Sequence, residues 1–104
     1  MNKKEIIDKI HDRSSSTMVE TLGIKIIDIG ENFVSGKMPV DKRTKQPFGL
    51  LHGGASVALA ETLGSIGAGM SIDQSSQSVV GIEINANHLK AVKTGWVFGK
   101  AKAL

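Results

Sequence analysis

The 104-residue sequence predicts a single α+β domain in which an antiparallel sheet wraps around one central helix. Three observations lead to this prediction. Residues 52–70 have helical character with apolar side chains on every side, residues 24–40 have the pattern of a β-hairpin, and residues 79–101 have the pattern of two further strands. Four strands cannot close around such a helix, so we expect something further to complete the covering.

The chain before the central helix divides into two short helices and two strands. Residues 3–12 place isoleucines at helical spacing between charged residues, which predicts an amphipathic helix. The serines at 14–16 are N-cap candidates for a short second helix over 17–22, which Gly23 is expected to end. Residues 24–29 and 33–40 are rich in β-branched residues and flank turn residues, which predicts a hairpin.

A polar, basic loop over residues 41–49 leads into the central helix. After the helix we expect a polar linker over residues 73–78 and a long strand over residues 79–89. A turn and a further strand over residues 96–101 are expected to follow.

The central helix carries one carboxylate, Glu61, among small and apolar residues. A charge in apolar surroundings is costly without partners, so Glu61 is a candidate functional residue; a narrow wet edge of the helix is the alternative.

Composition excludes several classes of protein. The chain has no cysteine, which rules out disulfides, zinc–thiolate sites and a cysteine nucleophile. The first residues lack the apolar run of a secretory signal, and the apolar stretch around Glu61 is short for a bilayer, so we expect a cytoplasmic protein without membrane contact. The net charge of +3 hints at an anionic partner, but the lysines are scattered with few aromatics, which disfavours nucleic acid.

Familiar cofactor and metal motifs are also absent from the pattern. The glycines between Gly30 and Lys37 are spaced too widely for a phosphate loop, and Met38 stands where such a loop needs Ser or Thr. The glycines late in the central helix do not match a dinucleotide fingerprint. His11, His52 and His88 are not at metal-ligand spacing, so we expect no metal site.

The start of the central helix has the chemistry of an anion site. His52, Gly53 and Gly54 lie where free backbone N–H groups and the helix dipole favour negative charge. The Gly53 N–H could polarise a substrate carbonyl as an oxyanion hole; the alternative is that the glycines only make a tight turn. Glu61 and Ser65, four residues apart, share a helix face.

The spacing of these groups predicts a site made from two chains. Glu61 lies nine residues beyond His52, which on a helix is about 13 Å of rise and roughly the opposite face. One chain can hardly bring both to one substrate atom. If both act on the same carbonyl, the His-Gly end of one helix must face Glu61 of another, which predicts a dimer with antiparallel central helices.

Two blocks of sequence resemble a known family. The first is QPFGLLHGGA (residues 46–55) followed by ALAET (58–62), and the second is GIEINANH (81–88). Together they resemble the hotdog-fold acyl-CoA thioesterases of the hydroxybenzoyl-CoA and phenylacetate-pathway type. The resemblance runs from about residue 24 to the end of the chain, and it is specific because both blocks match at the expected interval.

The resemblance implies roles for individual residues. Glu61 would be the catalytic carboxylate, acting as nucleophile or as general base for water, and the Gly53 N–H would polarise the thioester carbonyl. Gln46 and His52 would orient the thioester, and Ser65 would hold the attacking water or the acyl group. The residues implied to bind the remainder of the substrate are Phe48, Gly54, Val80, Gly81, Asn87, His88, Leu89 and Lys90. Lys90 would meet coenzyme A phosphates or lie solvated at a strand end.

The resemblance implies a cytoplasmic hydrolase that converts an aromatic or medium-chain acyl-CoA into the free acid and coenzyme A. No metal or cofactor is implied apart from the coenzyme A thioester substrate. The implied assembly is a homodimer with sites shared between subunits, and further a homotetramer. One alternative is a hotdog module that binds acyl-CoA without hydrolysis. A hotdog dehydratase is disfavoured, because that chemistry usually needs a histidine paired with a carboxylate at other positions.

The chain departs from the family pattern at its end. Family members usually continue with two more strands, one of which pairs inside the sheet with the strand over residues 79–89. We therefore expect the hotdog domain over residues 1–104 to be C-terminally incomplete, as a fragment of a longer product. The alternatives are that partner chains cover the sheet or that the protein no longer catalyses.

Overall fold

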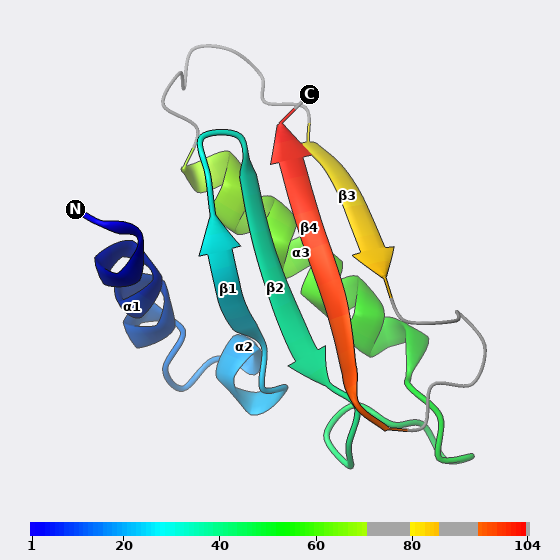
Figure 1. Ribbon diagram of the computed structural model, residues 1–104. Coiled ribbons are helices and arrows are strands. Elements are labelled where there is room, and N and C mark those ends of the chain that lie inside the picture. Colours follow the sequence, from blue (N-terminus) through cyan, green and yellow to red (C-terminus); the bar gives the residue numbers. More distant parts are fainter. Residues whose placement is uncertain (71–79, 86–93, 104) are drawn as a thin grey trace.

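The computed structural model describes residues 1–70, 80–85 and 94–103 of the chain. Figure 1 shows a sheet with one long helix crossing it and a helical segment at its side. The elements, in chain order, are α1 (Lys3–Arg13), α2 (Met18–Thr21), β1 (Lys25–Ile29), β2 (Phe33–Pro39), α3 (Gly53–Gly69), β3 (Val80–Asn85) and β4 (Trp96–Ala103). The predicted helices, hairpin and two later strands are confirmed, and of the long strand expected over 79–89 the structure describes residues 80–85.

The four strands form one antiparallel sheet in the order β1-β2-β4-β3 (Figure 1). In the middle of the sheet, Gly36 of β2 lies opposite Gly99 of β4. A β-bulge interrupts the pairing of β1 with β2 between Ile26 and Asp28. Because a bulge adds one residue to a strand, Ile26 and Ile29 can both be buried although they are three residues apart.

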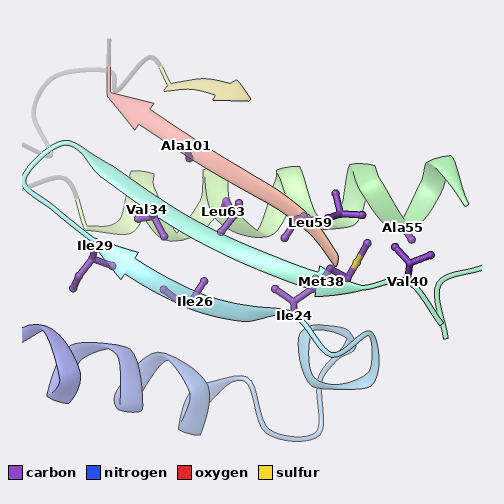
Figure 2. Packing of buried hydrophobic residues seen from close by; sticks show 11 residues of the cluster. Ile24, Ile26, Ile29, Val34, Met38, Val40, Ala55, Leu59, Leu63 and Ala101 are labelled. Carbon is purple, nitrogen blue, oxygen red and sulfur yellow. The ribbon is translucent and has the colours of Figure 1, made fainter. Parts of the chain in front are cut away.

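The core lies between the sheet and α3 (Figure 2). Side chains alternate along β2, so Val34 and Met38 point to the helix side and are buried. Gly36, between them, lets α3 approach the sheet closely: a Cβ there would lie 2.8 Å from Leu63 Cδ2. The buried side chains of this core are Ile24, Ile26, Ile29, Val34, Met38, Val40, Ala55, Leu59, Leu63, Val97 and Ala101.

Within the described part of the chain, the central helix has its buried residues on one face. Ala55, Leu59 and Leu63 face the sheet. A stripe on the opposite face of α3 is exposed; we call it the open stripe, and its residues are Gly54, Val57, Glu61, Ser65 and Ala68. A single chain thus covers one side of a helix that is apolar all round, as the number of strands predicts.

The N-terminal segment packs beside β1 (Figure 1). The isoleucines of α1 are half-buried against the core, and the Ile26 N–H donates to His11 Nε2 over 3.0 Å. The prediction that serines cap α2 was wrong. Ser14 instead ends α1, where its Oγ donates to Ile10 O, and Thr17 is the N-cap of α2. Within the described residues, no helix is both long enough and apolar enough to cross a bilayer.

Candidate functional site

His52 fixes the start of α3. Its backbone is extended, and its Nδ1 accepts a hydrogen bond from the Gly54 N–H over 2.8 Å, which makes it the N-cap of the helix. Because Nδ1 is the acceptor, the neutral imidazole carries its proton on Nε2 and presents a donor there. Gly54 is required beneath the ring, since a Cβ at this position would lie 2.9 Å from His52 Nδ1.

Gly53 presents an unused donor in open space. Among the described residues, none accepts a hydrogen bond from its backbone N–H. No atom lies within 4 Å of the place where a Cβ at this position would stand. The group is therefore a free N–H at the positive end of the helix dipole, which is the arrangement that stabilises a developing oxyanion.

The loop before α3 is held in place by Thr44. This side chain is buried, its Oγ1 donates to Pro39 O over 2.7 Å, and it accepts the Asp41 N–H over 3.2 Å. The Thr44 carbonyl accepts the His52 N–H over 2.7 Å. Thr44 thus ties the end of β2 to the beginning of α3.

An ion pair within this loop reinforces the turn. The Arg43 guanidinium donates to both carboxylate oxygens of Asp41, with 2.6 Å between Nη2 and Oδ2. The side-chain hydrogen bonds from Arg43 lower the pKa of Asp41 from its ordinary 3.8 to about 2. In return, the hydrogen-bonded carboxylate raises the pKa of the guanidinium.

Gln46 and Phe48 lie in the turn that follows. Gln46 Oε1 accepts the Phe48 N–H, and the Gln46 carbonyl accepts the Gly49 N–H over 2.9 Å. Gly49 closes the turn with a φ of 82°, in the left-handed region. The Gln46 oxygen is thus committed to the loop, its amide NH₂ is left as a donor, and the Phe48 ring is 88% exposed.

Glu61 and Ser65 share one face of α3, as predicted, and both are exposed in the single chain. Both line a pocket of about 540 Å³ between α3 and the α1–α2 segment. We call it the α1–α3 pocket, and its lining residues are Ile10, Arg13, Ser14, Thr17, Val19, Glu61, Thr62, Ser65, Ile66, Gly69 and Met70. The pocket places a carboxylate and a hydroxyl at the wall of a cavity large enough for a small organic group.

Two of the remaining predicted residues lie in the sheet. Val80 and Gly81 lie in β3, paired with Ala103 and Lys102 of β4. Asn87, His88, Leu89 and Lys90 lie outside the described residues. The described candidate residues near α3 thus form two separate groups, which we call half-sites: one at the start of α3 with Gln46, Phe48, His52, Gly53 and Gly54, and one at its middle with Glu61 and Ser65. The described residues contain no cluster of three or more potential metal ligands.

Two residues of the site and its supporting loop, Thr44 and Arg13, were not identified as important by the sequence patterns. Thr44 could have been found, because Asp-x-x-Thr after a strand is a turn signature in which side chains bond to nearby backbone. No sequence pattern distinguishes Arg13 as a site residue, because it is one of several charged residues in an amphipathic helix. Only the folded chain shows that it lines the same pocket as Glu61.

Comparisons with known proteins show which family the chain resembles. The family model of the Thioesterase superfamily matches residues 48–104. The chain is 47% identical to 1,4-dihydroxy-2-naphthoyl-CoA hydrolase of Escherichia coli over 102 residues, which cover 98% of this chain and 74% of that protein. It is also similar to crystal structures of thioesterases.

The first solved structure is a thioesterase from Haemophilus influenzae, with 43% identity and a TM-score of 0.74, covering 92% of this chain and 66% of that one. The second is a thioesterase mutant from Pseudomonas aeruginosa, with 39% identity and a TM-score of 0.74, covering 92% of this chain and 69% of that one. The chain thus spans about two thirds of the length of each solved relative.

Proposed function

The chain belongs to the thioesterase superfamily, and from that premise we propose that the protein hydrolyses an aromatic or medium-chain acyl-CoA to the free acid and coenzyme A. The name of the E. coli relative supports an aromatic acyl group, because that enzyme acts on a naphthoyl thioester. The two half-sites support hydrolysis, since one supplies an oxyanion donor and the other a carboxylate.

The open stripe of α3 is the observation that carries this proposal. Its members are small except for Val57 and Glu61, so a second helix can approach the backbone closely. In a symmetric dimer, two antiparallel copies of α3 are related by a two-fold axis. Gly53 of one copy lies opposite Glu61 of the other only if this axis passes the helix at the midpoint of the two positions, which is residue 57. Val57 stands there and is 63% exposed in the single chain. We therefore assign the open stripe to a homodimer interface.

Each group has a defined task in the reaction. The Gly53 N–H and the helix dipole stabilise the oxyanion that forms when the thioester carbonyl is attacked. Glu61 of the partner subunit either attacks this carbon directly or removes a proton from the attacking water, and Ser65 positions that water. The C–S bond then breaks, and the thiolate of coenzyme A takes up a proton. If water is the nucleophile, this step releases the acid. If Glu61 attacks, the step leaves a mixed anhydride on Glu61, which water then hydrolyses to the free acid and the carboxylate. These groups suffice for the reaction, so the proposal uses no metal and no cofactor.

The first test follows thiol release from benzoyl-CoA with a disulfide reagent. Replacing Glu61 by Ala or Gln should lower kcat by about 10²-fold or more, because the carboxylate is the nucleophile or base. Glu31→Ala is the matched control, since it removes an exposed carboxylate from the β1–β2 turn. Equal rates for Glu61→Ala and the parent would remove Glu61 from the mechanism. A parent that binds benzoyl-CoA without releasing thiol would instead be an acyl-CoA-binding module.

The second test asks whether two chains share one site. Gly53→Leu fills the open space at the oxyanion donor and Glu61→Ala removes the carboxylate, so each variant alone should be inactive. Mixed after dissociation and reassociation, they should regain about a quarter of the parent rate, because half of the dimers are mixed and each has one intact site of two. Absence of recovery in mixed dimers would contradict the shared site.

A further inference from the structure

The α1–α3 pocket has a wall that the proposed reaction does not use. One side is α3, with Glu61 and Ser65, and the other is the α1–α2 segment, with Arg13. At about 540 Å³ it is larger than a single ring requires, since a cavity of ~150 Å³ already holds benzene. Because Glu61 lines this pocket, an acyl group would extend into it once the thioester carbon reaches the carboxylate.

Apolar side chains make the pocket suitable for a hydrocarbon body. Ile10, Val19, Ile66 and Met70 line it, and each is also packed against the core. They come from both walls, so an acyl group entering from the α3 side contacts apolar surface from α1 and α2 as well. The pocket would therefore bind a ring by burial of apolar area.

The polar groups of the pocket differ in what they can still donate. Ser14 Oγ donates to Ile10 O over 2.8 Å, Thr17 Oγ1 to Ser14 O over 2.6 Å, and Thr62 Oγ1 to Ala58 O over 2.7 Å. These three hydroxyl protons are thus already used inside the chain. Arg13 takes part in no ion pair among the described residues, Glu61 included. The guanidinium is the strong donor of the α1 wall that remains available to a ligand.

From this arrangement we propose that Arg13 is a specificity-determining residue. Its guanidinium donates to an oxygen at the far end of the acyl group, opposite the thioester. The oxygen belongs to a neutral group such as a hydroxyl or carbonyl, because Glu61 on the facing wall would repel a second carboxylate. The inference rests on the proposed hydrolysis for its substrate, but it assigns the acyl subsite to the N-terminal helices.

The test compares two substrates of nearly the same shape, 4-hydroxybenzoyl-CoA and 4-methylbenzoyl-CoA. In the parent the ratio of their kcat/KM values should favour the hydroxyl compound. Arg13→Met should lower this ratio about tenfold, because one hydrogen bond to a charged donor is lost. Arg13→Lys keeps a charge but loses the planar fork and should fall between the two. Lys9→Met, exposed on the same helix and outside the pocket, should leave the ratio unchanged.

An unchanged ratio in Arg13→Met would overturn the proposal, as would an equal fall in Lys9→Met. A change of oligomeric state in Arg13→Met, measured by light scattering, would also overturn it, because Arg13 would then be an interface residue. Binding of both thioesters to Glu61→Ala protein, by titration calorimetry, separates this inference from the proposed function. If the parent releases no thiol but the affinity ratio still falls about tenfold in Arg13→Met, hydrolysis fails and the role of Arg13 stands.

Discussion

The His52 cap makes two adjacent glycines respond oppositely to the same substitution. A Cβ on Gly54 would lie 2.9 Å from both Nδ1 and Cε1 of His52, which is too close, so the imidazole must move and the 2.8 Å cap bond is lost. A Cβ on Gly53 would meet nothing within 4 Å. Alanine replaces glycine in a helix in both cases, but only at Gly54 does it displace the cap.

The expected changes in the free energy of unfolding follow from these contacts. Gly53→Ala should raise the free energy of unfolding by up to about 1 kcal/mol, because alanine is the better helix former. Gly54→Ala gains the same term but loses a cap worth ~0.5–2 kcal/mol, so its net effect should be near zero or destabilising. The two variants should differ by about 1 kcal/mol, or roughly 4–8 °C in Tm for a domain of this size.

Differential scanning calorimetry of both variants, in the parent and in the His52→Ala background, tests this reasoning. Without the imidazole the two alanine substitutions should stabilise equally, so the cycle should give a coupling of about 1 kcal/mol between positions 52 and 54. Equal Tm values for Gly53→Ala and Gly54→Ala in the parent would refute the cap. So would a difference between them that survives the removal of His52.

Three further substitutions probe the core and the loop before α3. Gly36→Ala should destabilise by about 1–3 kcal/mol in urea titrations, because the new Cβ would stand 2.8 Å from Leu63 Cδ2; an unchanged midpoint would mean that α3 does not approach the sheet so closely. Thr44→Val should lower the unfolding free energy by about 1–3 kcal/mol, since the buried Pro39 carbonyl and the half-buried Asp41 N–H lose their partner, whereas Thr44→Ser should stay near the parent. Equal losses for the two would show that the methyl group, not the hydroxyl, matters there. Asp41 has its pKa lowered from 3.8 to about 2 by Arg43, so its contribution to stability is present above pH 3.8 and lost as the pH falls toward 2. Asp41→Asn should therefore flatten the fall of Tm between pH 4 and pH 2, and a parallel fall in both proteins would exclude the ion pair as its cause.

The helices and strands could be predicted because their periodicity is unambiguous. The isoleucines of α1 recur at helical spacing, and the β-branched residues of β1 and β2 surround turn residues. The ends of elements could not be predicted as well. A run of Ser14, Ser15, Ser16 and Thr17 offers four residues of similar capping chemistry. In the structure Ser14 ends α1 and Thr17 begins α2.

The candidate site was predictable where it depends on helix geometry. The nine-residue separation of His52 and Glu61 already separates the two half-sites, and the structure places them at the start and the middle of α3. Thr44 bonds to residues only three to eight positions away, so the local Asp-x-x-Thr pattern already indicates its role. Arg13 differs, because it lines a pocket with α3 residues distant in sequence, and its neighbours are set by the docking of α1, which local patterns do not encode.

The two faces of α3 are both apolar, but their side chains differ in size. The buried face carries Leu59 and Leu63, which fill the space above the sheet, whereas the open stripe carries glycine, alanine and serine around Val57 and Glu61. Large residues suit a core that one chain completes, and small residues suit close contact with a second helix. On the proposed dimer, Glu61 loses its water only when the partner arrives, and the same event brings the Gly53 N–H to it. Assembly and the activation of the carboxylate would then be one step, so conditions that separate the chains should abolish hydrolysis without unfolding the sheet.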